Sequence, residues 1–200
     1  MIKLVNRKLA IVLYFVSLLI LRFNRSLRDK LVLVRNAILI GNVDQQNIPE
    51  RLERAIIAIE DKRFYSHKGI DFYSIGRAII KNTASKRLEG ASTIEQQLIR
   101  SVTNQREISL KRKLHEALLA ILIDKEFTKR EVLAGYLWSY DFNSCIGLFE
   151  LCRQEKYDLE ELSWKEAAQI AARLKYPSVN KRNYIKYLKR VRTIEIRLLH

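Results

Sequence analysis

The sequence contains few of the residues that interrupt helices or form covalent cross-links. Its 200 residues include two prolines, six glycines and two cysteines. So few helix-breaking residues favour a mainly α-helical chain and argue against a loop-rich fold. Cys145 and Cys152 form a single C-x6-C pair, which matches neither a zinc-binding nor a redox motif. We therefore expect two buried thiols.

Acidic residues are scarce relative to basic ones. The chain has 37 lysines and arginines against 22 aspartates and glutamates, which gives a formal net charge of +15. The excess is regional, because residues 116–172 are net acidic whereas residues 173–200 are strongly basic. A positive surface suits phosphate in nucleic acid, in lipid headgroups or in a pyrophosphate-linked substrate. Charge does not choose among these, and a basic C-terminal helix can also be only a solvated face.

One apolar run stands near the N-terminus. It extends from Leu9 to Leu21 behind three basic residues, and no small-residue cleavage site follows it, as in a signal anchor. A helix from Leu4 to Phe23 would be about 30 Å long, which matches a hydrocarbon core if its basic side chains extend to the interfaces. A membrane anchor is predicted, with a buried or interfacial helix as the alternative. Basic residues on both sides leave its orientation open.

Periodicity and capping residues predict a series of helices from about residue 49 onwards. Ser92, Thr128 and Ser163 each precede a glutamate by three residues, which is the capping-box pattern of a helix start. The stretch from Leu31 to Ile40 is rich in leucine and β-branched residues and could be a short strand or a continuation of the anchor. The predicted organisation is an anchor with its basic flank over residues 1–30, a connecting segment over 31–48 and one domain over 49–200.

Three motifs carry the chemistry. Ile56 to Asp71 reads IIAIEDKRFYSHKGID and places an acidic pair at the end of an apolar helical face, an arrangement suited to acid/base work. Gly90 to Arg100 reads GASTIEQQLIR, where hydroxyl and amide groups at a helix start can bind an anion or can simply cap the helix. Arg112 to Glu116 reads RKLHE, which is also the spacing of an ordinary helical ion pair.

In this order the motifs resemble those of the peptidoglycan glycosyltransferases, the transglycosylase domains found alone or in bifunctional penicillin-binding proteins. The resemblance covers about residues 50–180. It implies a mainly α, lysozyme-like glycosyltransferase domain with an N-terminal hydrophobic membrane-anchor helix. It also implies a reaction that polymerises lipid-pyrophosphate-linked disaccharide into glycan strands with inversion at the anomeric carbon.

The resemblance assigns roles to individual residues. Glu60 would be the general base that deprotonates the 4-hydroxyl of the incoming sugar, and Glu116 the second carboxylate, which assists departure or stabilises the transition state. Substrate and pyrophosphate binding would fall to Asp61, Phe64, His67, Thr93, Gln97, Arg100, Arg112 and Lys113. No protein metal site is expected, although a divalent cation near the pyrophosphate is known in the family. Both glutamates are expected to converge across one cationic cleft.

The same resemblance implies the surroundings of the chain. Its partners would be the lipid-linked disaccharide known as lipid II, the growing glycan, membrane lipids and other cell-wall synthesis proteins, and not nucleic acid. It would be a single-pass protein of the bacterial cytoplasmic membrane with its catalytic domain on the outer, periplasmic side.

Several positions depart from the family pattern. Arg100 and Ser101 replace a lysine and an asparagine, and arginine keeps the positive charge while adding a bidentate fork for phosphate. Ala134 and Trp138 replace a glutamate and an asparagine in the segment VLAGYLW. These changes leave open an inactive family member that binds lipid-linked sugar or scaffolds a cell-wall synthesis complex. Charge alone also admits a basic helical nucleic-acid binder.

Overall fold

The computed structural model describes residues 2–44, 48–84, 90–105, 107–139 and 147–199. Within these ranges the chain forms helices and no strand, which confirms the prediction of a mainly α fold. The elements are α1 (Ile2–Phe23), α2 (Arg25–Asp44), α3 (Glu50–Glu60), the short 3-10 helix η1 (Phe64–Ser66), α4 (Phe72–Ala84), α5 (Ile94–Val102), α6 (Leu110–Glu126), α7 (Lys129–Ser139), α8 (Leu148–Gln154), α9 (Trp164–Arg173) and α10 (Tyr184–Leu198).

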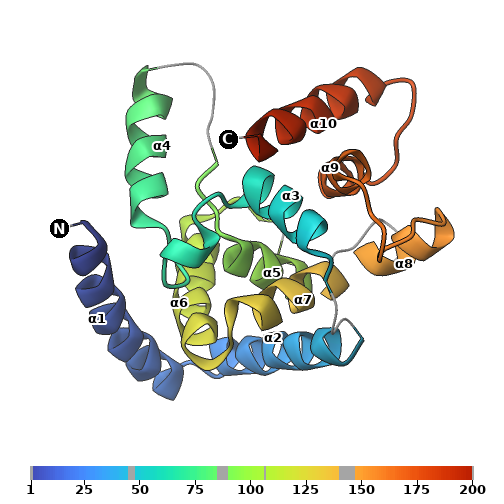
Figure 1. The fold of residues 1–200 in the computed structure, drawn as a ribbon. Coiled ribbons are helices and arrows are strands. Elements are labelled where there is room, and N and C mark those ends of the chain that lie inside the picture. The colour runs from blue at the N-terminus through green and yellow to red at the C-terminus, as the bar shows by residue number, and fades with distance from the viewer. Residues whose placement is uncertain (1, 45–47, 85–89, 106, 140–146, 200) are drawn as a thin grey trace.

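The helices pack around one apolar core. Helix α5 lies between α6 and α7, and α2 runs along α7 at the base of the view, whereas α3, α9 and α10 pack against one another (Figure 1). The apolar face predicted for α3 is buried, since Leu52, Ala55 and Ile56 have no exposed surface. Burial of this face leaves the C-terminal end of α3, with Glu60, at the edge of the core. Cys152 is buried as expected, and Cys145 lies outside the described residues.

Residues 31–48, which were expected to connect the anchor to the domain, lie mostly in a core helix. Helix α2 covers most of this segment, and its residues Leu27, Leu31, Val34 and Ile38 are all buried. Their spacing of four, three and four residues is helical, so one stripe of the helix faces the core. The strand interpretation is therefore wrong, and α2 belongs to the domain.

Helices α1 and α2 do not form one straight rod. The chain turns by 114° between Leu9–Phe23 and Arg25–Val43. Asn24 supports the turn, since its Oδ1 accepts a hydrogen bond of 3.0 Å from the backbone N–H of Leu27. Among the described helices, none has by itself the length and hydropathy of a membrane span, and only this bent pair reaches them jointly.

Small residues let α2 and α7 approach closely. A Cβ atom added at Gly41 would lie 2.9 Å from the carbonyl oxygen of Ala134, and one added at Gly135 would lie 2.8 Å from the Cα of Ile38. Ala134 itself is 2% exposed. A glutamate at this buried position would have to bury its carboxylate, which is costly without a partner. The burial of this position therefore favours alanine over glutamate.

Two of the three predicted helix starts are confirmed. Ser163 and Glu166 form a capping box at α9, and Thr128 and Glu131 exchange the same pair of hydrogen bonds at α7. The prediction for Ser92 is wrong by one residue, because Thr93 caps α5 and pairs with Gln96. This shift places Glu95 inside the protein, where its charge meets a buried cation described below.

Gly69 allows the loop between η1 and α4 to lie against α6. Its φ of +74° is in the left-handed region, and an added Cβ would lie 2.4 Å from the carbonyl oxygen of Ala120. We expect Gly69→Ala to lower the free energy of unfolding by more than about 2 kcal/mol, measured by chemical denaturation, because strain and steric overlap act together.

Gly76 is the matched control for this prediction. It lies within α4, and an added Cβ meets nothing within 4 Å. Gly76→Ala should be neutral or stabilising by up to about 1 kcal/mol, because alanine favours helix. Equal effects of the two substitutions would contradict the proposed contact between Gly69 and α6.

Candidate active site

A polar cavity of about 930 Å³ opens at the C-terminal end of α3, where the starts of α4 and α5 face α9 and α10. Its charged lining is mostly basic. The acidic residues are Glu60, Asp61 and Asp71, and the basic ones are Lys62, Arg63, Arg77, Arg100, Lys175, Arg190 and Arg197. Such a lining favours an anionic ligand, and the volume lies in the range typical of ligand sites.

Glu60, the last residue of α3, lines this cavity. One carboxylate oxygen, Oε1, forms an ion pair with Arg190 of α10. The other oxygen accepts no hydrogen bond from the described residues. Glu60 therefore has one oxygen held by the protein and one available to a molecule in the cavity, as a general base requires.

Asp61 joins the first motif to the second. Its Oδ2 lies 2.9 Å from Nε2 of His67 and accepts a hydrogen bond of 3.2 Å from the backbone N–H of Ile94, in the first turn of α5. Phe64 is fully buried, and its ring packs edge-on to that of His67. In this structure Phe64 and His67 lie behind the cavity lining, where they hold the loop after Glu60 in place.

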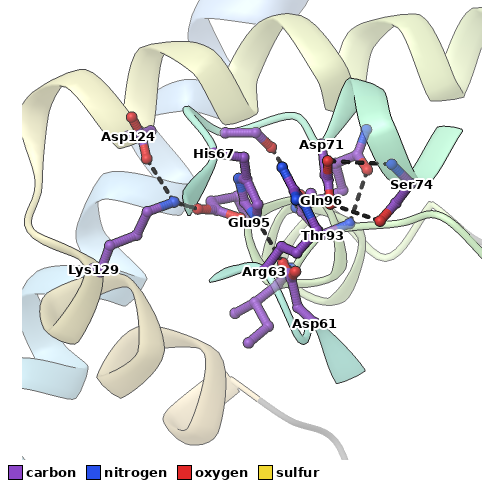
Figure 2. Close-up of polar contacts among 12 residues, drawn as sticks. Asp61, Arg63, His67, Asp71, Ser74, Thr93, Glu95, Gln96, Asp124 and Lys129 are labelled. Carbon is purple, nitrogen blue, oxygen red and sulfur yellow. Dashed lines mark hydrogen bonds and ion pairs between the residues drawn. The ribbon is translucent and has the colours of Figure 1, made fainter. Parts of the chain in front are cut away.

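Behind Asp61 the structure brings together a chain of buried charged groups (Figure 2). Lys129, at the start of α7, pairs with Glu95 of α5 and lies 2.7 Å from Oδ1 of Asp124 in α6. Burial raises the pKa of Glu95, and the positive charge of Lys129 opposes this shift only in part. For Lys129, burial acts to lower the pKa, but its two carboxylate partners hold it above its ordinary value.

Asp71 anchors the other wall of the cavity. Its Oδ1 accepts backbone hydrogen bonds from Tyr73 and Ser74 in the first turn of α4, and Oδ2 lies 3.0 Å from Nε of Arg63. Burial acts to raise the pKa of Asp71, but hydrogen bonds from Ser74 and the charge of Arg63 lower it below its ordinary value. Arg63 also lies over the ring of Tyr73. These contacts fix the side chains that form this wall.

The residues of the second motif line the cavity floor. Thr93 donates a hydrogen bond of 2.8 Å to the carbonyl oxygen of Gly69. Gln97, which also lines the cavity, accepts a hydrogen bond of 3.1 Å from the hydroxyl of Tyr136. Arg100, in the last turn of α5, lines the cavity as well. The Thr93 hydroxyl is buried and already bonded, so Gln97 and Arg100 are the side chains of this motif that could bind an anion.

Glu116 does not share this cavity with Glu60. Arg100 reaches both of its oxygens in a bidentate pair with two distances of 2.9 Å, and Arg112 pairs with it from one turn earlier on α6. Glu116 is 2% exposed and lines a second, more apolar cavity of about 590 Å³, together with Lys113. The two cavities adjoin through Gly90–Ser92. The two carboxylates thus lie in neighbouring cavities, connected through Arg100.

The cavity lining does not fit a divalent cation. Of its carboxylates, Glu60 pairs with Arg190, Asp71 with Arg63, and Asp61 with His67. Asp61, His67 and Glu95 do place ligand atoms within 4.8 Å of one another, but Lys129 already supplies a cation to Glu95. We therefore assign no step to a metal.

Sequence reasoning missed two groups of residues near the site. Glu95 and Lys129 are 34 residues apart, and Arg190 and Glu60 are 130 residues apart, so no local pattern connects them. The strongly basic segment 173–200 was the available indication, and it contributes Lys175, Arg190 and Arg197 to the cavity.

The fold and site define a helical protein with a cavity that is lined mainly by basic side chains and by the carboxylate of Glu60. A family model described as Transglycosylase matches residues 35–198. The chain belongs to this family.

The match begins within α2, in keeping with the burial of that helix. Relatives named penicillin-binding protein 1A come from Clostridium botulinum (strain Langeland), 35% identical over 78% of this chain, and Rickettsia conorii, 38% identical over 66%. Another, from Clostridium tetani, is 30% identical over 76% of this chain. The aligned segment spans about a fifth of each of these relatives, namely 21%, 18% and 21% of their lengths.

Proposed function

We propose that this chain is a peptidoglycan glycosyltransferase that polymerises lipid-pyrophosphate-linked disaccharide into glycan strands with inversion. The observation that carries the proposal is Glu60, which lines a cavity formed mainly by basic side chains and has only one of its carboxylate oxygens paired with Arg190. A base and an anion-binding surface within one cavity are what transfer from a pyrophosphate donor requires. Membership in the transglycosylase family supports the same conclusion.

In the proposed reaction, Glu60 removes the proton from the 4-hydroxyl of the acceptor sugar. The freed oxygen attacks the anomeric carbon of the donor from the face opposite the pyrophosphate, so the configuration inverts. The bond from that carbon to the pyrophosphate oxygen breaks, and its electron pair leaves with the pyrophosphate. Arg100 and its basic neighbours in the cavity stabilise the negative charge that develops on the leaving group.

Glu116 acts in this scheme through Arg100. Its bidentate contact fixes the plane of the guanidinium, and Arg112 supplies a second positive charge that balances the buried carboxylate. A guanidinium held in one orientation binds a phosphate oxygen without losing further side-chain freedom. Glu116 is therefore a positioning residue in this proposal and does not need to contact the substrate.

The direct test is incubation of the full chain, in detergent or lipid vesicles, with labelled lipid-linked disaccharide. The expected result is a ladder of glycan strands with release of lipid pyrophosphate. Binding of the labelled lipid without polymer would overturn the proposal and would favour the inactive, lipid-binding family member.

The proposed substrate lies in a membrane, and α1 presents a suitable surface. Ile11, Val12, Phe15, Leu19 and Phe23 are all more than half exposed. We propose that α1 associates with the outer side of the bacterial cytoplasmic membrane, which would bring the catalytic domain to its substrate. Burial of such side chains in lipid contributes about 1.5–3 kcal/mol each.

Replacing Phe15 and Leu19 together by aspartate is expected to lower the fraction of protein that sediments with phospholipid vesicles by at least about tenfold, because two large side chains leave the lipid. Ile196→Asp, at an exposed apolar position on α10, is the control and should sediment like wild type. Unchanged sedimentation of the double variant would show that this face of α1 does not contact the membrane.

A further inference from the structure

Arg190 is placed beside Glu60 by the C-terminal helix. Its Nη2 pairs with Oε1 of Glu60, and each side chain of the pair is about 15% exposed. Its Nε is buried and has no hydrogen-bond partner in the described part of the chain. The ion pair with Glu60 is therefore the contact that holds this guanidinium.

Glu60 has little else to hold its side chain. It is the final residue of α3, and the chain leaves the helix at Asp61. A glutamate at such a position has several rotamers, and only some of them point its carboxylate into the cavity. A general base must lie within hydrogen-bond distance of its proton, so a misplacement of about 1 Å can cost roughly 100-fold in rate.

Helix α10 is well placed to supply this support. It packs against both α3 and α9, and it buries Tyr187, Val191 and Ile194. Arg197, two turns after Arg190, donates a hydrogen bond of 2.8 Å to the carbonyl oxygen of Ala58 in α3. Arg190 therefore projects from a helix that is fastened on the same side of the molecule as Glu60.

We propose that Arg190 is a positioning residue for Glu60, holding Oε1 so that Oε2 faces the acceptor hydroxyl. This inference rests on the proposed function. Arg190 does not exchange a proton in the step. The O–H bond of the acceptor breaks, its proton moves to Oε2 of Glu60, and the freed oxygen forms the new glycosidic bond as the pyrophosphate departs. The alternative is a purely structural pair that joins α10 to α3.

The test compares Arg190→Gln and Arg190→Lys in the full chain, each in the wild-type and the Glu60→Gln background. If Arg190 positions the base, Arg190→Gln lowers kcat by roughly 10- to 100-fold and changes KM by less than about threefold. Arg190→Lys recovers part of kcat because it keeps the charge. In the Glu60→Gln background Arg190→Gln has no further effect, since there is no base left to position. Arg192→Gln, at an exposed position on the same helix, should behave like wild type.

A purely structural role predicts a different result. Arg190→Gln would then lower activity by the same factor in both backgrounds, in step with a lower melting temperature, and this outcome overturns the inference. An independent readout follows the arginine side-chain resonances of ¹⁵N-labelled protein. Glu60→Gln should shift those of Arg190, and unshifted resonances also overturn the inference.

Failure of the two proposals can be distinguished. No polymer from the wild-type chain defeats the proposed function. A wild-type chain that polymerises, together with an Arg190→Gln variant that polymerises equally well, defeats only the positioning role.

Discussion

Replacing Glu60 by glutamine is expected to lower the rate of glycan polymerisation by roughly 10²- to 10⁴-fold, the usual contribution of a positioned general base. Glutamine has nearly the same shape, so the cavity and the fold should persist. An amide oxygen cannot take up the proton of the acceptor hydroxyl, and the nucleophile then forms too slowly. Initial rates with labelled lipid-linked disaccharide, and the melting temperature of each variant, provide the measurement.

Glu50→Gln is the matched control for this prediction. Glu50 lies on the same helix, and its ion pair with Arg54 is exposed on the surface, so the same chemical change should leave polymerisation unaffected. If Glu60→Gln retained the wild-type rate, Glu60 would not be the base. Loss of activity with a large fall in melting temperature would instead indicate that the Arg190 pair is needed for folding.

Lys129→Met is expected to lower the free energy of unfolding by about 3–5 kcal/mol, the largest effect on stability that we predict. Glu95 has no exposed surface, so its carboxylate would lose its cation away from water. Asp124, whose side chain is 5% exposed, would keep only the longer contact of 3.8 Å with Lys68. Removing one partner of a buried pair leaves an uncompensated charge, which costs far more than the pair contributes. Denaturant unfolding at neutral pH measures this loss.

Two comparisons identify the cause of the loss. Glu95→Gln should destabilise less than Lys129→Met, because Lys129 keeps Asp124 as its partner. Combining the two substitutions should recover part of the stability lost in Lys129→Met, because the buried charge of Glu95 is then absent. Lys125→Met, at an exposed position near the end of α6, should change stability by less than about 0.5 kcal/mol. If both lysine substitutions had similar effects, the buried pairs would not be the reason.

The Lys129→Met variant should also depend on pH in a definite direction. Burial raises the pKa of Glu95 in the folded state, and Lys129 partly opposes the shift, so the variant has a pKa that is raised further. A raised carboxyl pKa contributes stability that is fully present below the unfolded pKa and is lost as pH rises through the folded one. The difference in free energy of unfolding between wild type and the Lys129→Met variant should therefore narrow as the pH falls from about 8 to about 5. A difference that widened on acidification would exclude Glu95 as its source.

Local sequence patterns predicted much of the helical structure. The apolar face of α3 and the capping residues of α7 and α9 were identified because each depends on residues within a few positions of one another. The prediction at Ser92 failed by one residue, since Ser92 and Thr93 can both cap a helix. In the structure Thr93 is the cap, and with this cap Glu95 is buried in the first turn of α5, where it pairs with Lys129 of α7. A local pattern that fits two registers leaves the choice to distant neighbours.

For the candidate site, too, local motifs predicted some features and the contacts between helices decided the others. The motifs indicated Glu60, Thr93, Gln97 and Arg100 as site residues, and the structure places all four on one cavity. The motifs did not indicate that Glu116 would face a neighbouring cavity, or that Arg190 would pair with Glu60. The spacing within a motif fixes which side of its own helix a residue occupies, but not which other helix covers that side.

The amino-acid order alone determined the helical class of this chain, its family and the identity of the acidic and basic groups available for chemistry, because these follow from composition and short-range spacing. Only the tertiary structure decided the protonation environment and orientation of those groups. Arg190, Lys129 and Arg100, which pair with Glu60, Glu95 and Glu116, come from other helices, and a buried carboxylate takes its properties from the charges packed against it.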